Sequence, residues 1–287
     1  MPQPKFTATA RLKRLGAALR ALRAESDLTV NQVATSLNWS GSKVSRIETA
    51  KQIVSSDDVR ALVSLYDVGA DEIEKYVAIA RQVKQRDWWH KYDDVLPEWF
   101  EGYLGLEAEA SKISTYEADL VPGLLQTEQY AAAVLGAFPL RTTPEEMERS
   151  VDLRRARQAR LCDENPLILD AVISETVLRR GIGGSTVMRE QLEHLAAMVQ
   201  RPNVTVRLLP FDAGEHPGIN GAFSVLEFAD ADEGRIVTVE TMTSTLYIEK
   251  TRDVGIYRLA FEQIRSAALG PGETDDMIKA TTRELEP

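Results

Sequence analysis

Two short amphipathic segments follow each other between residues 28 and 48, and this spacing restricts the fold more than any other feature of the chain. Thr29 begins the first segment, with Gln32 three residues later as the partner of a capping box. Ser40 begins the second, where apolar residues again recur at helical spacing. Asn38 lies in the interruption between them. The stretch therefore predicts two short helices joined by a tight turn.

Further helix signals surround this pair. Leucines from Leu12 to Leu22 recur at the spacing of an amphipathic helix. Ser55 or Ser56 precedes two aspartates at the start of another helix, and apolar residues predict a last one from Asp71 to about Lys84. We therefore expect residues 1–87 to form an all-α domain of five helices.

The charge of the chain is unevenly distributed. Its formal net charge is −10, yet residues 1–51 contain nine Lys or Arg against three acidic residues. That segment therefore carries +6 and the remainder −16. Surface charges act over a Debye length of about 8 Å, so a basic N-terminal segment is compatible with DNA contact even though the rest of the chain is acidic. The alternative is a solvated surface that happens to be asymmetric.

The sequence LTVNQVATSLNWSGSKVSRIE, from Leu28 to Glu48, resembles the lambda-repressor-like (XRE) helix-turn-helix family. This resemblance implies a five-helix DNA-binding domain and double-stranded DNA as the partner. One position departs from the family pattern. The family commonly has Gln directly after Thr29, where it helps to hold a phosphate, and this chain has Val30. Phosphate contact at this helix start is then left to its backbone amides.

The resemblance also implies roles for individual side chains. The second helix is expected to enter the major groove, which is about 12 Å wide. There Ser42, Ser45 and Arg46 would face base edges, and Arg46 can pair with both acceptors of a guanine. By analogy with the family, Glu48 should pair with Arg23. Lys43 and Lys51, together with Ser40, would instead bind phosphate and fix the register, and Gln32 is a further candidate DNA contact. The alternative for these side chains is an ordinary solvated helix face.

An aromatic segment follows at residues 88–100, where five aromatic side chains occur within thirteen residues. Two interpretations remain open. The segment is either a docking hinge between domains or subunits, since Trp and Tyr are enriched at interfaces, or the lid of one hydrophobic core.

Residues 101–287 alternate between helical and strand patterns, which predicts a mixed α/β domain with a partly antiparallel sheet and an α+β fold class for the whole chain. Helix patterns cover residues 106–110, 128–135, 144–162, 185–199, 252–268 and 273–284. Strand patterns cover residues 113–116, 167–173, 204–209, 223–228, 236–240 and 246–248.

This second half resembles the long C-terminal region, without an assigned activity, that follows the helix-turn-helix in many actinomycete regulators. The resemblance rests on motifs such as Leu120 to Thr127, Val187 to Leu192, Pro202 to Val206 and His216 to Gly218. It implies a regulator of development or specialised metabolism, of a kind often encoded beside a small partner protein.

Enzyme motifs are weak in comparison. The histidines lie apart, and Cys162 is the single cysteine. Glu175, Glu227 and Glu240 lie on or beside strands and are interpreted as exposed strand residues rather than as a catalytic pair. We therefore expect no catalytic residue, no metal site and no cofactor.

These observations predict a DNA-binding transcriptional regulator, a repressor and homodimer, that is cytoplasmic and associated with the nucleoid. Its C-terminal domain would bind a small partner protein or a small-molecule effector. Two alternatives remain open: an antitoxin-like protein that neutralises a small partner and regulates its own operon, and an enzyme domain tethered to DNA. No membrane association is expected, because the most apolar stretch has ten residues, Ala131 to Leu140, where about 20 are needed.

Overall fold

The computed structural model describes residues 10–52, 54–84, 88–137, 143–229 and 234–285. The chain forms two compact units, the first from residues 1–90 with 104–106 and the second from residues 91–103 with 107–287. The domain boundary expected between residues 87 and 88 falls beside residues 85–87, which lie outside the described residues.

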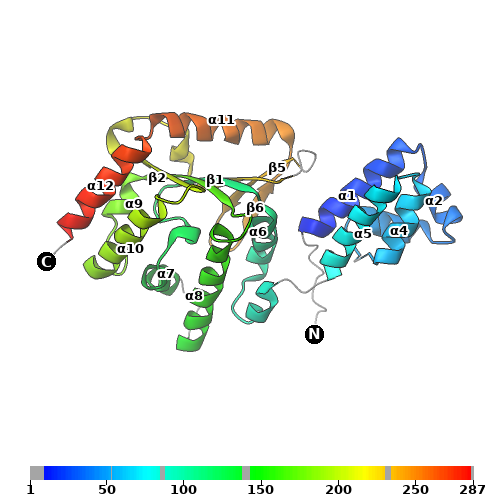
Figure 1. The fold of residues 1–287 in the computed structure, drawn as a ribbon, viewed down its shortest axis with the longest axis horizontal. Helices are drawn as coiled ribbons and strands as arrows, with labels where there is room; N and C mark the ends of the chain where they lie inside the picture. Colours follow the sequence, from blue (N-terminus) through cyan, green and yellow to red (C-terminus); the bar gives the residue numbers. More distant parts are fainter. Residues whose placement is uncertain (1–9, 53, 85–87, 138–142, 230–233, 286–287) are drawn as a thin grey trace. The chain divides into compact units, whose positions relative to one another are not determined.

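The first unit is all-α, which confirms the fold class predicted for this part of the chain. Its helices are α1 (Ala10–Glu25), α2 (Val30–Ser36), α3 (Gly41–Glu48), α4 (Ser56–Leu65) and α5 (Ala70–Lys84) (Figure 1). Their apolar faces meet in one core that includes Leu15, Val33 and Val44. A Cβ atom at Gly16 would lie 2.7 Å from the carbonyl oxygen of Ile47, so the close approach of α1 to the end of α3 requires glycine.

The helices of this unit share one way of ending. Each of α1 to α4 is followed, two residues after its last residue, by a non-glycine residue in the left-handed region. These residues are Asp27, Asn38, Ala50 and Asp67, with φ between 53° and 57°. This conformation closes a helix with local hydrogen bonds, and three of the four positions carry the short polar side chains that tolerate it best. The sequence predicts the turn at Asn38, and it predicts the end of the fourth helix at Gly69, whereas α4 ends at Leu65 because Asp67 adopts the left-handed conformation.

The second unit contains a six-stranded sheet in the order β3-β2-β1-β4-β5-β6. The three strands β1, β2 and β3 pair in parallel, whereas β1 with β4, β4 with β5 and β5 with β6 pair antiparallel. The strands are β1 (Lys112–Glu117), β2 (Ile168–Ser174), β3 (Val204–Leu209), β4 (Phe223–Glu227), β5 (Arg235–Glu240) and β6 (Thr245–Ile248). The predicted mixed α/β domain with a partly antiparallel sheet is confirmed.

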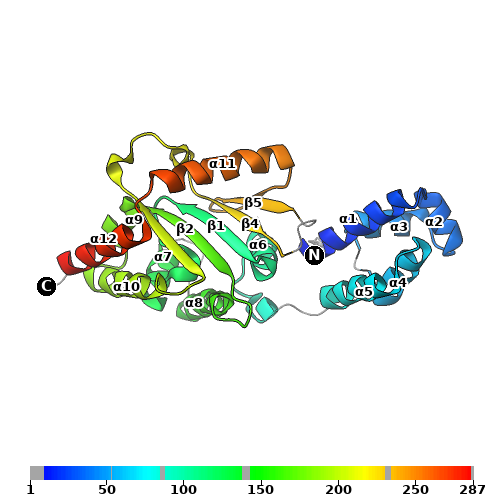
Figure 2. The same cartoon turned by 45° about the horizontal axis from the view of Figure 1, so that its top comes forward.

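Helices cover both faces of this sheet. Helix α11 (Thr251–Ala267) lies along one face, and α6, α7, α8 and α10 lie on the other (Figures 1 and 2). Side chains such as Tyr116, Val225 and Phe261 form the core under α11. The remaining helices are α6 (Glu98–Glu109), α7 (Glu128–Gly136), α8 (Pro144–Gln158), α9 (Glu175–Arg179), α10 (Ser185–Met198) and α12 (Pro271–Glu284).

Helix α6 differs from its prediction. The sequence indicated a helix only over residues 106–110, whereas α6 begins at Glu98, inside the aromatic segment. Phe100 and Tyr103 stack with ring centroids 5.2 Å apart, and the guanidinium of Arg157 lies 5.0 Å from the Phe100 ring. The many aromatic residues of this stretch hide the apolar period of a helix in the sequence, and tertiary packing stabilises the helix in the folded protein. Within the aromatic segment Trp89 and Tyr92 are buried, whereas Trp99 and Phe100 of α6 are half-buried, and a docking role of the segment stays a prediction.

In the described part of the chain, no helix combines the length and the apolar character needed to cross a membrane.

Candidate nucleic-acid interface

Helices α2 and α3 begin at the two residues that the sequence indicated. The Thr29 side chain accepts a hydrogen bond from the Gln32 amide, and the Thr29 amide donates to Gln32 Oε1 at 2.8 Å, which completes a capping box. The Ser40 hydroxyl accepts from the Lys43 amide at 3.1 Å. Between the helices, Asn38 adopts φ 55° and lets the chain turn sharply. These local contacts set where α3 starts and thus which residues form its first turn.

Helix α3 has one buried side and one exposed side. Val44 and Ile47 lie three residues apart and therefore share one side of the helix, and both are fully buried in the core of the first unit. Ser42, Ser45 and Arg46 are exposed on the remaining surface of the helix. The structure therefore brings the three predicted base-reading residues onto the exposed surface of one short helix.

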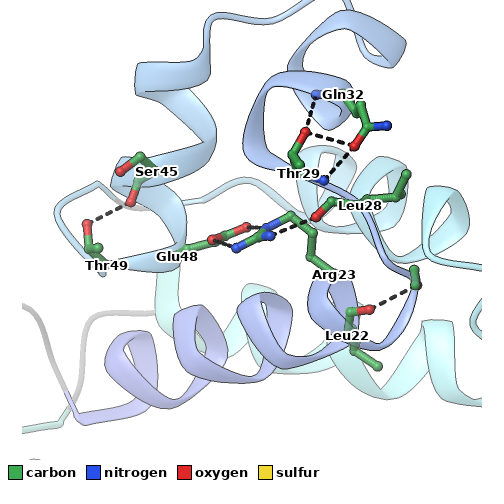
Figure 3. A network of polar contacts seen from close by, with 9 residues as sticks. Leu22, Arg23, Leu28, Thr29, Gln32, Ser45, Glu48 and Thr49 are labelled. Carbon is green, nitrogen blue, oxygen red and sulfur yellow. Dashed lines mark hydrogen bonds and ion pairs between the residues drawn. The ribbon is translucent and has the colours of Figure 1, made fainter.

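The pair expected from the resemblance is formed in the structure. Arg23 donates from Nε to Glu48 Oε1 at 2.7 Å and from Nη2 to Glu48 Oε2 at 2.9 Å (Figure 3). The remaining nitrogen, Nη1, donates to the Leu28 carbonyl at 2.8 Å. One guanidinium thus joins α1, the start of α2 and the end of α3.

The Arg23–Glu48 pair is largely shielded from water. The Glu48 side chain is 4% exposed and that of Arg23 is 15% exposed. The hydrogen bonds with Glu48 raise the pKa of the Arg23 guanidinium above its ordinary value. The pKa of the nearby Tyr66 phenol is also raised, first by burial and then by the negative charge of Glu48. Ionised Glu48 is therefore balanced by a cation that cannot titrate near neutral pH.

The predicted phosphate contacts are less uniform. Lys43 forms an ion pair with Asp58 at 2.8 Å, and its ammonium lies 3.6 Å from the centroid of the Trp39 ring. Its charge is therefore engaged within the unit. Arg46 and Lys51 are exposed and form no ion pair with any of the described residues. Gln32 uses its side-chain oxygen in the capping box, and Figure 3 shows its side-chain nitrogen pointing away from Thr29.

Sequence reasoning missed two neighbours of this surface. Thr49 is exposed directly after α3, with its hydroxyl donating to the Ser45 carbonyl at 2.7 Å (Figure 3). Asn31, on α2, is exposed, and its side-chain oxygen would lie 3.2 Å from a Cβ atom at Gly41. The helical period extended by one step from Ser45 would have found Thr49. Nothing in the local sequence pattern places Asn31 beside the start of α3.

Two family models match the chain in separate regions. One, described as a domain of unknown function (DUF5753), matches residues 100–280, which is more than half of the chain. The chain belongs to the DUF5753 family. The other, described as a helix-turn-helix domain, matches residues 14–75 and contains every residue of the surface described above. No curated protein and no solved structure matches this DUF5753 protein.

The matches give a coarse function for each half of the DUF5753 protein. A helix-turn-helix domain indicates a DNA-binding regulator, and α2 and α3 are its two characteristic helices. The C-terminal domain belongs to a family without an assigned role. In the described residues of this protein, no group of three His, Cys, Asp or Glu side chains is arranged to hold a metal ion.

Proposed function

We propose that this DUF5753 protein is a sequence-specific transcriptional regulator of the lambda-repressor-like (XRE) type, of the kind found in actinomycetes, which inserts α3 into the major groove. The observation that carries this proposal is the two-sided character of α3. Its buried side anchors the helix through Val44 and the Arg23–Glu48 pair, and its exposed side presents Arg46 with two short hydroxyl side chains. A long donor beside small polar residues suits readout of a guanine.

Replacing Arg46 by alanine tests this assignment. We expect Arg46→Ala to weaken operator binding by about 1–3 kcal/mol and to relax the base preference at one position, because a bidentate contact to guanine is lost. Lys51→Ala should instead weaken binding to all sequences alike and lower the salt dependence by about one phosphate contact. The operator is first selected from a random duplex pool with the full chain and then titrated at several salt concentrations.

A matched control for Arg46 is Arg60, an arginine of the same unit that lies on α4 and pairs with Glu74 at 2.6 Å. Arg60→Ala should leave the base preference unchanged. An Arg46→Ala protein that keeps both its affinity and its base preference would contradict the proposed role of α3.

The proposal includes a homodimer. A single helix-turn-helix domain of this kind buries only about 600–1,000 Å² on DNA. Such regulators therefore gain affinity by placing two of these domains on half-sites about 34 Å apart. We assign the contact between the two copies to the C-terminal domain. The outer side of α11 supports this, since Ile256 and Leu259 are 58% and 69% exposed one helical step apart, on the side opposite the buried Val254.

We expect the full chain to sediment as a dimer at micromolar concentration and to protect two inverted half-sites. Leu259→Asp should shift it to a monomer and leave one half-site protected, because the charge would be buried in the contact. Met242→Asp, at an apolar residue that is 74% exposed on another surface, is the matched control and should remain dimeric. A wild-type monomer at this concentration would refute the dimer.

The remaining parts of the proposal follow from DNA binding. The protein would act in the cytoplasm, at the nucleoid, and repression is its simplest output because a protein on an operator excludes others from the same DNA.

The C-terminal domain would receive a partner protein or a small-molecule effector rather than catalyse a reaction. In support, motif residues have structural roles there: Gln191 binds the Thr127 amide at 2.7 Å and the Leu125 carbonyl at 2.8 Å.

A further inference from the structure

A cavity of about 520 Å³ lies within the second unit, between the sheet and the helices on the face opposite α11. Its walls come from residues 97–103, strands β1, β4 and β5, the segment 118–126, and helices α7 and α8. This volume falls within the range of about 300–1,000 Å³ that is usual for small-molecule sites. Most of the lining is apolar, with Trp99, Phe100, Leu124, Val134 and Leu153 among the residues that contribute.

The floor of this cavity is a polar patch on the sheet. Alternate residues of a strand face the same side, so Thr115 and Glu117 of β1 share the cavity face. Thr115 is in register with Ser224 of β4, which is in register with Thr238 of β5. Three hydroxyls therefore form a row across neighbouring strands, and the Ser224 hydroxyl donates to that of Thr115 at 2.9 Å.

Two carboxylates stand in the next row. Continuing the same register by one pleat places Glu117 and Glu240 on either side of Ala222, the residue before β4. Strands two apart in a sheet are separated by about 10 Å. Ala222 carries only a methyl group, so the space above it is left between the two carboxylates. All three residues line the cavity.

The arginines beside these carboxylates are already engaged. Arg157 donates two hydrogen bonds to Glu107, at 2.8 and 2.7 Å, and both side chains are buried. Arg154 donates to Gln126 Oε1 at 2.5 Å. Neither Glu117 nor Glu240 forms an ion pair with a basic side chain in the described part of the chain. The cavity thus holds two carboxyl groups without an ion pair among the described residues: Arg154 acts on both only through its longer-range charge, and Arg157 is already paired with Glu107.

We propose that this cavity binds a small organic cation, an amphipathic amine whose ammonium group lies between Glu117 and Glu240 and whose apolar body packs on Trp99, Phe100 and Leu124. An ammonium supplies the donors and the charge that the two carboxylates lack, and the apolar surroundings of the half-buried Glu117 strengthen its pairing more than that of the exposed Glu240. Anionic ligands are disfavoured, because Arg157 is already paired with Glu107 and therefore offers no unmatched charge to an anion.

The protonation of Glu117 adds a signature to this binding. Burial, followed by repulsion from Glu240, raises the pKa of Glu117 to about 8. The other titratable groups that interact with it are Arg154, Asp119, Tyr103, Tyr116 and Tyr130. At pH 7 the carboxyl is mostly protonated, and it must ionise to pair with an ammonium. Binding should therefore release about one proton.

The inference rests on the proposed function only where it makes the amine an effector of DNA binding. Binding itself is measured on the full chain without DNA. If the amine binds and no operator is found, the proposed function fails and the cavity assignment stands. If an operator is bound and no amine is, the cavity assignment alone fails.

Dansylcadaverine, a fluorescent amphipathic primary amine, is the probe, and its N-acetyl derivative is the matched uncharged control. We expect saturable binding at one site per chain for the amine and binding at least about tenfold weaker for the acetylated compound. Calorimetry at pH 7 in phosphate and in HEPES should give enthalpies that differ by the ionisation of about one buffer proton. Equal binding of the two compounds, or no saturable binding of either, would overturn the proposal.

Variants locate the site. Glu117→Gln keeps the shape of the side chain and should weaken dansylcadaverine binding at least about tenfold, with the proton release lost. Glu193→Gln, at an exposed residue of α10 outside the cavity, should bind as the wild type does. Should Glu117→Gln lose its fold by circular dichroism, Glu240→Gln takes its place with the same expected loss of affinity. Wild-type affinity in a folded cavity variant would overturn the assignment to this cavity.

Discussion

Arg157→Ala should lower the free energy of unfolding of the C-terminal domain by about 3–5 kcal/mol. Arg157 and Glu107 are 7% and 2% exposed in their side chains and are joined by two parallel hydrogen bonds. Removing the guanidinium leaves the Glu107 carboxylate buried without a cation, which costs far more than the pair gains in the intact protein. The same change removes the cation that packs on Phe100 and Tyr103. Calorimetry of the full chain, which contains two units, measures the loss.

The neighbouring Arg155 is the matched control. It pairs with Glu128 at 3.1 Å, but the two side chains are 67% and 57% exposed. Water screens such a pair, so Arg155→Ala should cost about 0–1 kcal/mol. A double variant, Glu107→Leu with Arg157→Met, removes both charges and should recover most of the loss. If Arg157→Ala is as mild as Arg155→Ala, the buried pair does not support the domain.

Glu48→Ala should destabilise the helix-turn-helix unit by about 2–4 kcal/mol, because Arg23 would lose both acceptors on α3 while remaining largely buried. Operator binding should fall in parallel, since α3 is no longer tied to α1. Glu48→Gln retains the shape and one acceptor oxygen, so its loss should be smaller. Urea unfolding followed by the fluorescence of Trp39 and the other tryptophans reports the change.

An exposed pair in the same unit separates charge from burial. Glu74 accepts from Arg60 at 2.6 Å, with side chains 58% and 45% exposed. Glu74→Ala should therefore change the stability by less than about 1 kcal/mol. Equal effects of Glu48→Ala and Glu74→Ala would show that the Arg23–Glu48 pair does not hold α3 in place.

The helix-turn-helix was accessible from the sequence because its signals are local. Thr29, Gln32 and Ser40 act within three residues of themselves, and the apolar residues of α3 recur within two turns. Such signals specify where helices start and which side is buried. The fate of Lys43 could not be predicted in this way, since its partner Asp58 lies on the next helix.

In the C-terminal domain, by contrast, the local sequence pattern does not indicate the candidate site. Its strands were predicted to within a few residues from apolar runs, yet the sequence pattern ended the first strand at Tyr116, and Glu117 was missed. Glu240 is exposed, as the sequence pattern predicts, and it also lines the cavity, which no local pattern indicates. An isolated glutamate at a strand end has the same local pattern whether it faces bulk water or a cavity.

Most helix and strand positions, the capped turn and the basic charge of residues 1–51 were predictable from the sequence, because each depends on neighbours within a few residues, whereas the first half of α6 and the short α9 were not. The cavity was not. It exists because β4 begins one residue after Ala222, because β1 and β5 pair with it in one particular register, and because α6, α7 and α8 cover that face. Register and packing are settled by contacts between residues far apart in the chain, so the placement of Glu117 and Glu240 on either side of Ala222 follows from the folded sheet rather than from any local pattern.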